Sequence, residues 1–185
     1  MKSAIVTPSL KKPSLDSNIL KHYRPILNLP FTSEVLEKIR ALRLISYLSE
    51  YSLLEPLQFA YKRFHSTETA LLKVHNDICM SLDSGQCVLL VLLDLSAAFD
   101  TIDHDMLLTR LLKLGITDTP LLWFSSYLKD RHQYVSINDS LSASHVLQTG
   151  VPQGSVLGPL LFSISISPLG KLIRQHGDNQ LYPAF

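Results

Sequence analysis

Residues 87–105, CVLLVLLDLSAAFDTIDHD, decide the fold of this chain. The first nine of them, 87–95, are apolar or nearly so apart from one carboxylate, Asp94. An apolar run of this length predicts a strand that is buried on both faces. Burying an ionised aspartate is costly unless a partner, commonly a metal ion, compensates it. We therefore expect Asp94 to lie at the open end of a buried strand, facing a ligand.

The residues after Asp94 are those expected beside a ligand. Residues 96–98 are Ser-Ala-Ala, which leaves room against the backbone, and the ring of Phe99 can form the wall of a pocket. Asp103 and Asp105 then stand at the start of a predicted helix. For these two carboxylates, capping the helix and favouring its positive end is the simpler interpretation.

Composition predicts one globular domain. The chain has 185 residues, of which 46% are hydrophobic and 18% charged, and this length suffices for a sizeable core. Cys79 and Cys87 fall on faces that we expect to be buried, so neither a disulfide framework nor a zinc site is predicted. A reducing compartment fits, and we expect an intracellular location, in the cytoplasm or nucleus. No stretch has the length of a signal peptide or a membrane span.

The formal net charge of +1 is unevenly distributed. Residues 1–75 contain eleven Lys and Arg against six Asp and Glu, whereas residues 76–185 contain six against ten. A basic half suits a phosphate backbone and an acidic half suits metal ions. Ordinary surface scatter explains the same pattern, and charge alone leaves both interpretations open.

Periodicity and capping residues predict four helices. Residues 34–50 have helical spacing after a possible cap at Ser33, with the apolar positions Val35, Leu36, Ile39, Leu42, Ile45 and Leu48. A second helix opens at Ser66 and is closed by Gly85, with the apolar face Leu71, Leu72, Val74, Ile78 and Leu82. A third spans about 104–114 and stops at Gly115, and a fourth begins near Thr119 and Pro120.

The remaining segments predict an irregular arm, a hairpin and one ambiguous stretch. Residues 1–20 are rich in Pro, Ser and Lys and are expected to be irregular. Residues 133–137 alternate, meet the turn pair Asn138-Asp139, and are followed by a returning segment at 144–149. Residues 157–166 fit a helix or a strand, and sequence alone leaves that choice open.

The loop at residues 150–155, Gly-Val-Pro-Gln-Gly-Ser, can approach a ligand closely. Proline fixes the approach of the chain, glycine allows close backbone contact, and Gln153 offers an amide to a base or a sugar. Pro-Gly loops are common, so this loop is informative only together with the Asp94 segment.

Taken together, these segments resemble the reverse transcriptases of non-LTR (LINE-type) retrotransposons. The resemblance runs nearly from end to end of the chain. The segments that carry it are HYRPILNLP (22–30), FHSTETALLKV (64–74), LLVLLDLSAAFDTIDHDMLL (89–108), WFSSYL (123–128) with Arg131, and GVPQGSVLGPLLF (150–162).

The resemblance implies RNA-templated DNA synthesis, in which a primer 3′-hydroxyl attacks a deoxynucleoside triphosphate held by two Mg²⁺ ions. RNA template, DNA primer and deoxynucleoside triphosphates are the implied partners. Carried over by position, Asp94 resembles the first metal-binding aspartate, beside the backbone carbonyl of Leu95. Phe99 resembles the steric gate against a ribose 2′-hydroxyl. Gln153 and Gly154 resemble the loop that shapes the nucleotide pocket.

The carry-over extends to the basic N-terminal half, where one departure occurs. Arg24 resembles a residue that meets the template, and the Lys62-Arg63 pair resembles residues that meet the triphosphate. The family usually has Gly-Phe-Arg where this chain has Ala60-Tyr61-Lys62. A point charge thus replaces an arginine fork that binds bidentately.

A larger departure lies near the C-terminus. The family continues from His-Gly through a short strand into Tyr-Ala-Asp-Asp, whereas residues 175–182 here read QHGDNQLY. The simplest alignment deletes the strand and most of that motif, so that Asp178 stands for the second catalytic and metal-binding aspartate beside Asp94. This truncated site lacks the bridging carboxylate of a two-metal centre. We therefore expect polymerase descent with loss of activity.

The resemblance implies an α+β fold with the fingers and a partial palm of a right-hand polymerase. The expected palm sheet is antiparallel and packed on helices, and the thumb is absent. The expected boundaries are an arm at 1–20, fingers at about 21–85 and palm at about 86–185. Three interpretations remain open: a fragment of a retrotransposon polymerase, a non-catalytic nucleic-acid-binding remnant, and a degenerate product without a role. An endonuclease domain is expected to have preceded Met1 in the ancestor.

Overall fold

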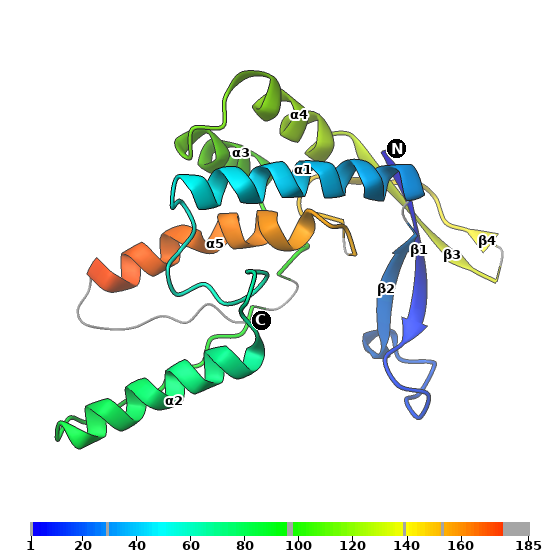
Figure 1. Cartoon of the computed structure of the whole chain (residues 1–185). Helices are drawn as coiled ribbons and strands as arrows, with labels where there is room; N and C mark the ends of the chain where they lie inside the picture. Colours follow the sequence, from blue (N-terminus) through cyan, green and yellow to red (C-terminus); the bar gives the residue numbers. More distant parts are fainter. Residues whose placement is uncertain (1, 29, 96–97, 139, 153, 176–185) are drawn as a thin grey trace.

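A computed structural model describes residues 2–28, 30–95, 98–138, 140–152 and 154–175. Within these residues, five helices and a small sheet make a mixed α/β fold, with the sheet at one end of the helices (Figure 1). The helices are α1 (Phe31–Glu50), α2 (Thr67–Asp83), α3 (His104–Lys113), α4 (Asp118–Leu128) and α5 (Gly158–Gln175), with a 3₁₀ turn η1 (Leu20–His22). The strands are β1 (Ser3–Leu10), β2 (Tyr23–Asn28), β3 (Arg131–Ile137), β4 (Ser140–Leu141) and β5 (His145–Leu147).

The sheet has the order β2-β1-β3-β4, and β5 also pairs with β3. β1 is antiparallel to β2 but parallel to β3, with Ile5 opposite Tyr134. Within residues 86–185, where an antiparallel sheet was expected, β3 pairs antiparallel with both β4 and β5, and β1 adds a parallel neighbour from outside that portion. The expectation of an irregular arm at 1–20 is wrong, since residues 3–10 form β1. The reason is that β1 finds its partner β3 about 130 residues away, and local composition carries no sign of that pairing.

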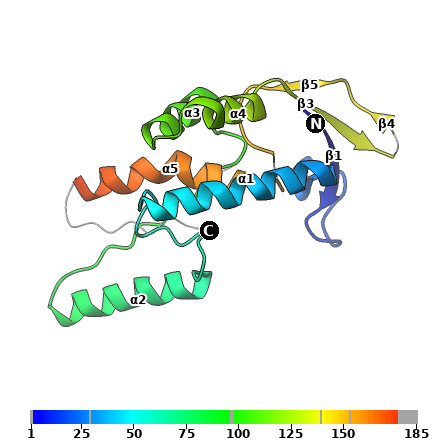
Figure 2. The ribbon, with the colours of Figure 1, turned by 45° about the horizontal axis from the view of Figure 1, so that its top comes forward.

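The core lies where α1, α3, α4 and α5 pack together. Its largest fully buried side chains belong to leucines of these four helices and of the loop before α5: Leu48, Leu107, Leu111, Leu128, Leu157 and Leu161. Figure 2 shows α3 and α4 on one side of α1 and α5, while α2 is set apart from the other helices in both views. The loop from 149 to 157 enters this core through Val151 and Leu157.

The buried face of α1 differs from the predicted one. Its buried residues are Ser33, Glu37, Ala41, Leu44 and Leu48. Of the predicted apolar face, only Leu48 is fully buried, whereas Val35, Ile39, Leu42 and Ile45 are exposed. The helix carries apolar residues on two sides, and tertiary packing covers the other side. The helix also begins at Phe31 after Pro30, so Ser33 lies inside it and does not cap it.

Local capping signals were predicted correctly at α2 and α3. The side chain of Ser66 accepts a hydrogen bond from the amide of Thr69, and the Thr69 hydroxyl accepts one from the amide of Ser66, which is a reciprocal capping box. Asp103 caps α3 by accepting a bond of 2.7 Å from the Met106 amide. Gly115 follows α3 with φ +86°. The apolar face predicted for α2 is not buried, because Ala70 is the one residue of this helix that is buried.

The prediction of a buried strand at residues 87–95 is wrong. The structure gives this segment no regular secondary structure, and all nine of its residues are exposed, Asp94 included. Cys87 is exposed and Cys79 half-buried, and both are free thiols, so the expectation of two buried cysteines is wrong as well. The sequence correctly shows how apolar the segment is. Burial needs partner strands, and the described part of the chain supplies none.

Three further predictions are compared with the structure here: a hairpin, an ambiguous stretch and the start of the fourth helix. The predicted hairpin is confirmed: β3 pairs with β4 across Asn138, which has φ +47°, and β5 returns along β3. The ambiguous stretch at 157–166 belongs to α5 and the turn before it. α4 begins at Asp118 after Thr117, close to the predicted start.

None of the described helices is long and apolar enough to cross a membrane.

Candidate nucleotide-binding site

The two motifs that the sequence singled out lie side by side. The segment after Asp94 and the loop that begins at Gly150 are joined by backbone hydrogen bonds of 2.8 Å, from Gly150 N to Ile102 O and from Val151 N to Phe99 O. The Thr149 hydroxyl also donates to the carbonyl of Asp100 at 3.0 Å. This juxtaposition brings residues almost fifty positions apart into one small site at the start of α3.

Gly150 is required at the crossing point of these segments. Its φ is +85°, and a Cβ at this position would lie 2.9 Å from the backbone of both Phe99 and Asp100. The buried side chain of His104 donates from Nε2 to the Gly150 carbonyl at 2.7 Å. Only glycine suits this position, because the φ is positive and no room exists for a Cβ. The amide of Gly150 bonds to Ile102 and its carbonyl to His104, so this one residue connects the two motifs.

Glu37 holds the other end of the same loop, and sequence reasoning missed it. Its side chain is 3% exposed and accepts bonds from the amides of Val156 at 2.9 Å and Leu157 at 3.4 Å, just before α5 begins. The Tyr127 hydroxyl donates to its other oxygen at 3.2 Å. Burial, followed by the charge of Glu37, raises the pKa of Tyr127. The signal in the sequence was the position of Glu37, which stands four residues before Ala41. Both residues fall on the side of α1 that proved to be buried.

Phe99 packs into the helices and does not stand free. Its ring centroid is 5.4 Å from that of Phe162 on α5. A neighbouring pocket lies between α3, α5 and the end of the exposed apolar segment. Its lining residues are Leu95, Ala98, Thr101, Ile102, Asp103, Met106, Leu107, Phe162, Ser165 and Ile166. No Lys or Arg is among them, so this pocket as it stands has no cation for a triphosphate.

The described residues do not form a preassembled magnesium site made of protein ligands alone. No group of three or more His, Cys, Asp or Glu that could hold a metal ion occurs among them, whereas Mg²⁺ requires near-octahedral oxygen ligation. Asp94 lies in the exposed segment. The second predicted aspartate, Asp178, lies outside the described residues, and so does Gln153. Gly154 has φ +81° and open space where a Cβ would be.

The predicted phosphate-binding cations are not joined to this site by any contact within the described residues. Lys62 Nζ donates to the carbonyl of Pro56 at 3.5 Å, and the Arg63 guanidinium lies 4.7 Å from the Phe64 ring centroid. Arg24 is exposed on β2 opposite Ser9, in the sheet. The structure thus brings Phe99 and the Gly150 loop together but leaves Arg24, Lys62 and Arg63 in separate places.

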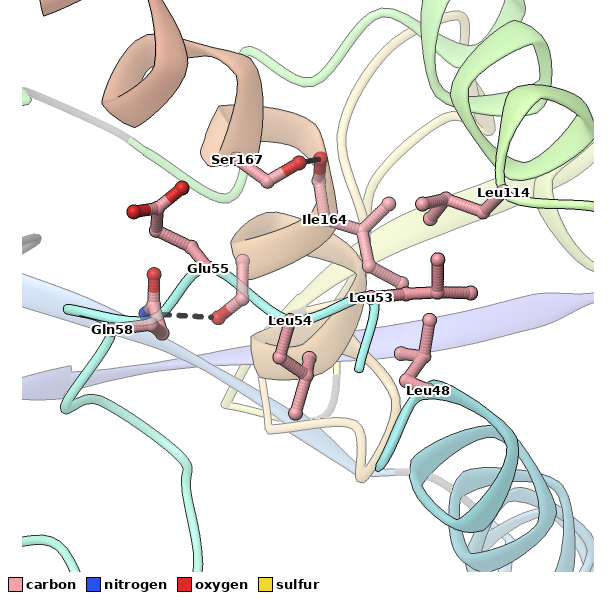
Figure 3. Close-up of a pocket in the computed structure, with 9 residues that line it drawn as sticks. Leu48, Leu53, Leu54, Glu55, Gln58, Leu114, Ile164 and Ser167 are labelled. Atoms are coloured by element: carbon pink, nitrogen blue, oxygen red, sulfur yellow. Dashed lines mark hydrogen bonds between the residues drawn. The ribbon is translucent and has the colours of Figure 1, made fainter. Parts of the chain in front are cut away.

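A second pocket, shown in Figure 3, lies between the segment after α1 and helix α5. Gln58 and Glu55 reach from this segment toward α5, and the Gln58 amide donates to the Ser163 hydroxyl at 3.3 Å. Glu55 forms an ion pair with Arg174, whose Nη2 lies 3.0 Å from Glu55 Oε2. The hydrogen bond with Glu55 raises the pKa of Arg174. The pocket is lined by four leucines, one isoleucine and four polar residues. Two of the polar residues, Glu55 and Gln58, hold α5 in place through the contacts above.

Comparison with known proteins decides the family. The sequence matches the family described as reverse transcriptase (RNA-dependent DNA polymerase) over residues 10–182. The chain belongs to the reverse transcriptase family. Three relatives from Drosophila melanogaster place this reverse transcriptase domain among those of LINE-type retrotransposons. The resemblance seen in the sequence motifs is thereby confirmed.

The similarity covers most of this reverse transcriptase domain but little of its relatives. It is 34% identical over 163 residues to the probable RNA-directed DNA polymerase from transposon BS, which is 86% of this chain and 18% of the relative. It is 34% identical over 159 residues to the corresponding X-element protein, 84% of this chain and 17% of the relative. It is 30% identical over 147 residues to the RNA-directed DNA polymerase from the mobile element jockey, which is 80% of this chain and 16% of the relative. The chain therefore spans less than a fifth of each of these proteins.

Proposed function

We propose that this chain derives from the RNA-directed DNA polymerase of a LINE-type retrotransposon and no longer transfers nucleotides. The observation that supports descent is the match over residues 10–182 together with 34% identity to two transposon polymerases. In that ancestry, RNA template, DNA primer and deoxynucleoside triphosphates are the partners, Mg²⁺ is the cofactor, and the location is intracellular, in cytoplasm or nucleus.

The proposed division of the chain follows the ancestral enzyme. An arm at 1–20, fingers at about 21–85 and a partial palm at about 86–185 place Asp94, Leu95, Phe99 and Gly154 in the palm. The contact of the Phe99 segment with the Gly150 loop supports this grouping. β1 and β3 share one sheet, so the arm and the palm portion are physically connected in this chain.

Loss of activity is supported by the sequence at residues 175–182 and by the position of Asp94. The Tyr-Ala-Asp-Asp motif is reduced to Asp178 there, and Asp94 lies in an exposed segment without regular structure. In-line phosphoryl transfer depends on metal ions held about 3.5–4 Å apart by shared carboxylates. The described residues build no such arrangement, and we assign no chemical step to them.

Primer extension tests this proposal. The purified chain is expected to extend oligo-dT on a poly-rA template no faster than its Asp94→Asn variant, with either Mg²⁺ or Mn²⁺ present. The variant is the matched control, because Asp94 is exposed and its replacement should leave the fold unchanged. Extension by the parent chain at ten times the rate of the variant, or more, would show that the catalytic aspartate still works and would refute the loss of activity.

A second candidate function, nucleic-acid binding without catalysis, is favoured by the hairpin of β1 and β2. Its connection displays the exposed cations Lys11, Lys12 and Lys21, and Arg24 lies on the adjoining strand. Lys11 Nζ donates to the Lys21 carbonyl at 2.8 Å, which fixes this cluster. The hairpin starts beside the N-terminal end of α1 and projects away from the helices (Figure 1), so a phosphate backbone can reach it. Such contacts bind without regard to sequence.

A gel-shift titration with an RNA–DNA hybrid tests this binding function. Replacing Lys12 and Lys21 by Gln leaves the Lys11 side chain in place and removes two charges from the hairpin. Affinity is expected to fall about tenfold, and the slope of log K against log salt to decrease by about 2, because two phosphate contacts are lost. Lys113→Gln, at the exposed end of α3, is the control and should bind like the parent. Equal affinity of all three proteins would contradict the proposal.

A further inference from the structure

The connection between β1 and β2, residues 11–22, is an exposed loop that projects away from the helices (Figure 1). None of its residues is buried, and the side chains of Ile19 and Leu20 are 43% and 88% exposed. A backbone hydrogen bond of 2.8 Å from Lys11 N to His22 O closes the base of the loop. Because no buried apolar side chain anchors the loop, its tip can open at little cost in free energy.

Ser14 lies in a turn of this loop and has an unused hydroxyl group. The Leu15 amide donates to the Lys12 carbonyl at 3.2 Å, which closes a β-turn with Pro13 and Ser14 at its central positions. Ser14 is exposed, and its hydroxyl makes no hydrogen bond with any of the described residues. This oxygen is therefore accessible to an enzyme that modifies it.

The neighbours of Ser14 have the charge pattern that a basophilic protein kinase selects. Lys11 and Lys12 precede Ser14 by three and two positions, and the apolar Leu15 follows it directly. Kinases discriminate between substrates by complementary charge, so a kinase with an acidic substrate groove selects serines that follow cations. Both lysines are exposed, and such a groove can reach them together with the serine.

A second serine that follows cations, Ser66, differs in what its hydroxyl contacts. Lys62 and Arg63 precede it by four and three positions. Its oxygen accepts a hydrogen bond from the Thr69 amide as the cap of α2, and a hydrogen bond from Ser66 lowers the pKa of the Glu68 carboxyl. A phosphate on Ser66 would face that carboxylate, and like charges repel. The geometry therefore favours Ser14 over Ser66 as a site of modification.

We propose that Ser14 is the phosphorylation site of a basophilic serine kinase, and that its phosphate prevents the hairpin from binding nucleic acid. This inference rests on the binding function proposed above for Lys11, Lys12 and Lys21. The kinase transfers the γ-phosphoryl group of ATP to the Ser14 oxygen. A P–O bond forms at that oxygen, the bond to the β-phosphate breaks, ADP leaves with its electron pair, and the hydroxyl proton passes to the carboxylate base of the kinase.

The charge of the loop explains how one phosphate changes binding. Residues 11–22 contain three lysines and one aspartate, so their formal charge is +2 with His22 neutral. A phosphoserine adds a charge of about −1.5 to −2 at pH 7, which brings the loop close to neutrality. Its oxygens also form charge-assisted hydrogen bonds with ammonium groups nearby. Lysines held in this way no longer neutralise the phosphates of a nucleic acid, and the release of counterions that drives binding is lost.

Phosphate incorporation tests the site independently of nucleic-acid binding. The purified chain is incubated with ATP and the catalytic subunit of cAMP-dependent protein kinase, and mass spectrometry locates the modified residue. We expect phosphate on Ser14, and a rate about tenfold lower when Lys11 and Lys12 are both replaced by Gln. Ser14→Ala is the matched control and should remove this incorporation. Incorporation at Ser66 instead of Ser14, or none at all, would overturn the proposal.

Titration of the phosphorylated chain with an RNA–DNA hybrid tests the regulation. Phosphorylation should lower the affinity about tenfold and the slope of log K against log salt by about 2, because the charge of two lysines is cancelled. Kinase-treated Ser14→Ala is the control and should bind like the untreated parent. Equal affinity of the phosphorylated and untreated chains would overturn the regulation. A parent chain that does not bind the hybrid would refute the binding function and the regulation with it, and separate measurement of incorporation distinguishes these failures.

Discussion

Replacing Glu37 by alanine is expected to lower the free energy of unfolding by about 3 kcal/mol. The carboxyl group is buried and accepts hydrogen bonds from the Val156 and Leu157 amides and from the Tyr127 hydroxyl. Removing it leaves donors in the core without a partner, and each buried unsatisfied donor costs about 1–3 kcal/mol. The loss should therefore be several times larger than that of an average surface substitution.

Chemical denaturation followed by the fluorescence of Trp123 measures this effect. Trp123 is the sole tryptophan of the chain and stacks on Tyr127 with ring centroids 5.3 Å apart, so it reports on the Glu37 contacts directly. Glu50→Ala is the matched control, because Glu50 is exposed at the end of the same helix. Glu37→Gln keeps one acceptor oxygen and the side-chain volume, and should recover part of the loss. A loss of under about 1 kcal/mol for Glu37→Ala would show that these hydrogen bonds are not what holds the loop.

Replacing Gly150 by alanine is expected to cost about 3 kcal/mol for two separate reasons. The φ of +85° is unfavourable for a residue with a Cβ, and that atom would lie 2.9 Å from backbone atoms of Phe99 and Asp100. Backbone cannot rotate away as a side chain can. The bonds from Gly150 N to Ile102 O and from Val151 N to Phe99 O must then lengthen, which separates the two motifs of the site.

Gly154→Ala separates the two contributions to this cost. Gly154 has a similar φ of +81° in the same loop, but, its chain neighbours aside, no atom of the described residues lies within 4 Å of the position of its missing Cβ. Its replacement should cost only the conformational strain, about 1–2 kcal/mol. The same denaturation experiment measures both variants. Equal losses for Gly150→Ala and Gly154→Ala would show that the close contact with Phe99 and Asp100 does not constrain the loop.

Local signals in the sequence predicted the elements whose geometry is set by near neighbours. Ser66 before α2, Asp103 before α3 and Gly115 after α3 act through hydrogen bonds or dihedral angles within a few residues. The turn at Asn138 is of the same kind. Such interactions form in the same way wherever the segment lies in the fold, and sequence reasoning therefore located these boundaries well.

The candidate site was predictable in part. The sequence singled out Phe99 and the Gly150 loop, and the structure brings them into contact. The sequence did not reveal Glu37, because an acidic residue on a helix is usually solvated. Only the packing of α1 against the loop before α5 buries this one. It also placed Asp94 in a buried strand, whereas the structure leaves that segment exposed.

The sequence by itself determined the family, the composition of the 87–95 segment and the ends of α2 and α3. Only the tertiary structure decided which side of α1 is buried, that β1 lies parallel to β3, and that residues 87–95 have no partner strand among the described residues. The physical reason is that hydrophobicity states how much a segment gains from burial, while burial itself depends on distant parts of the chain.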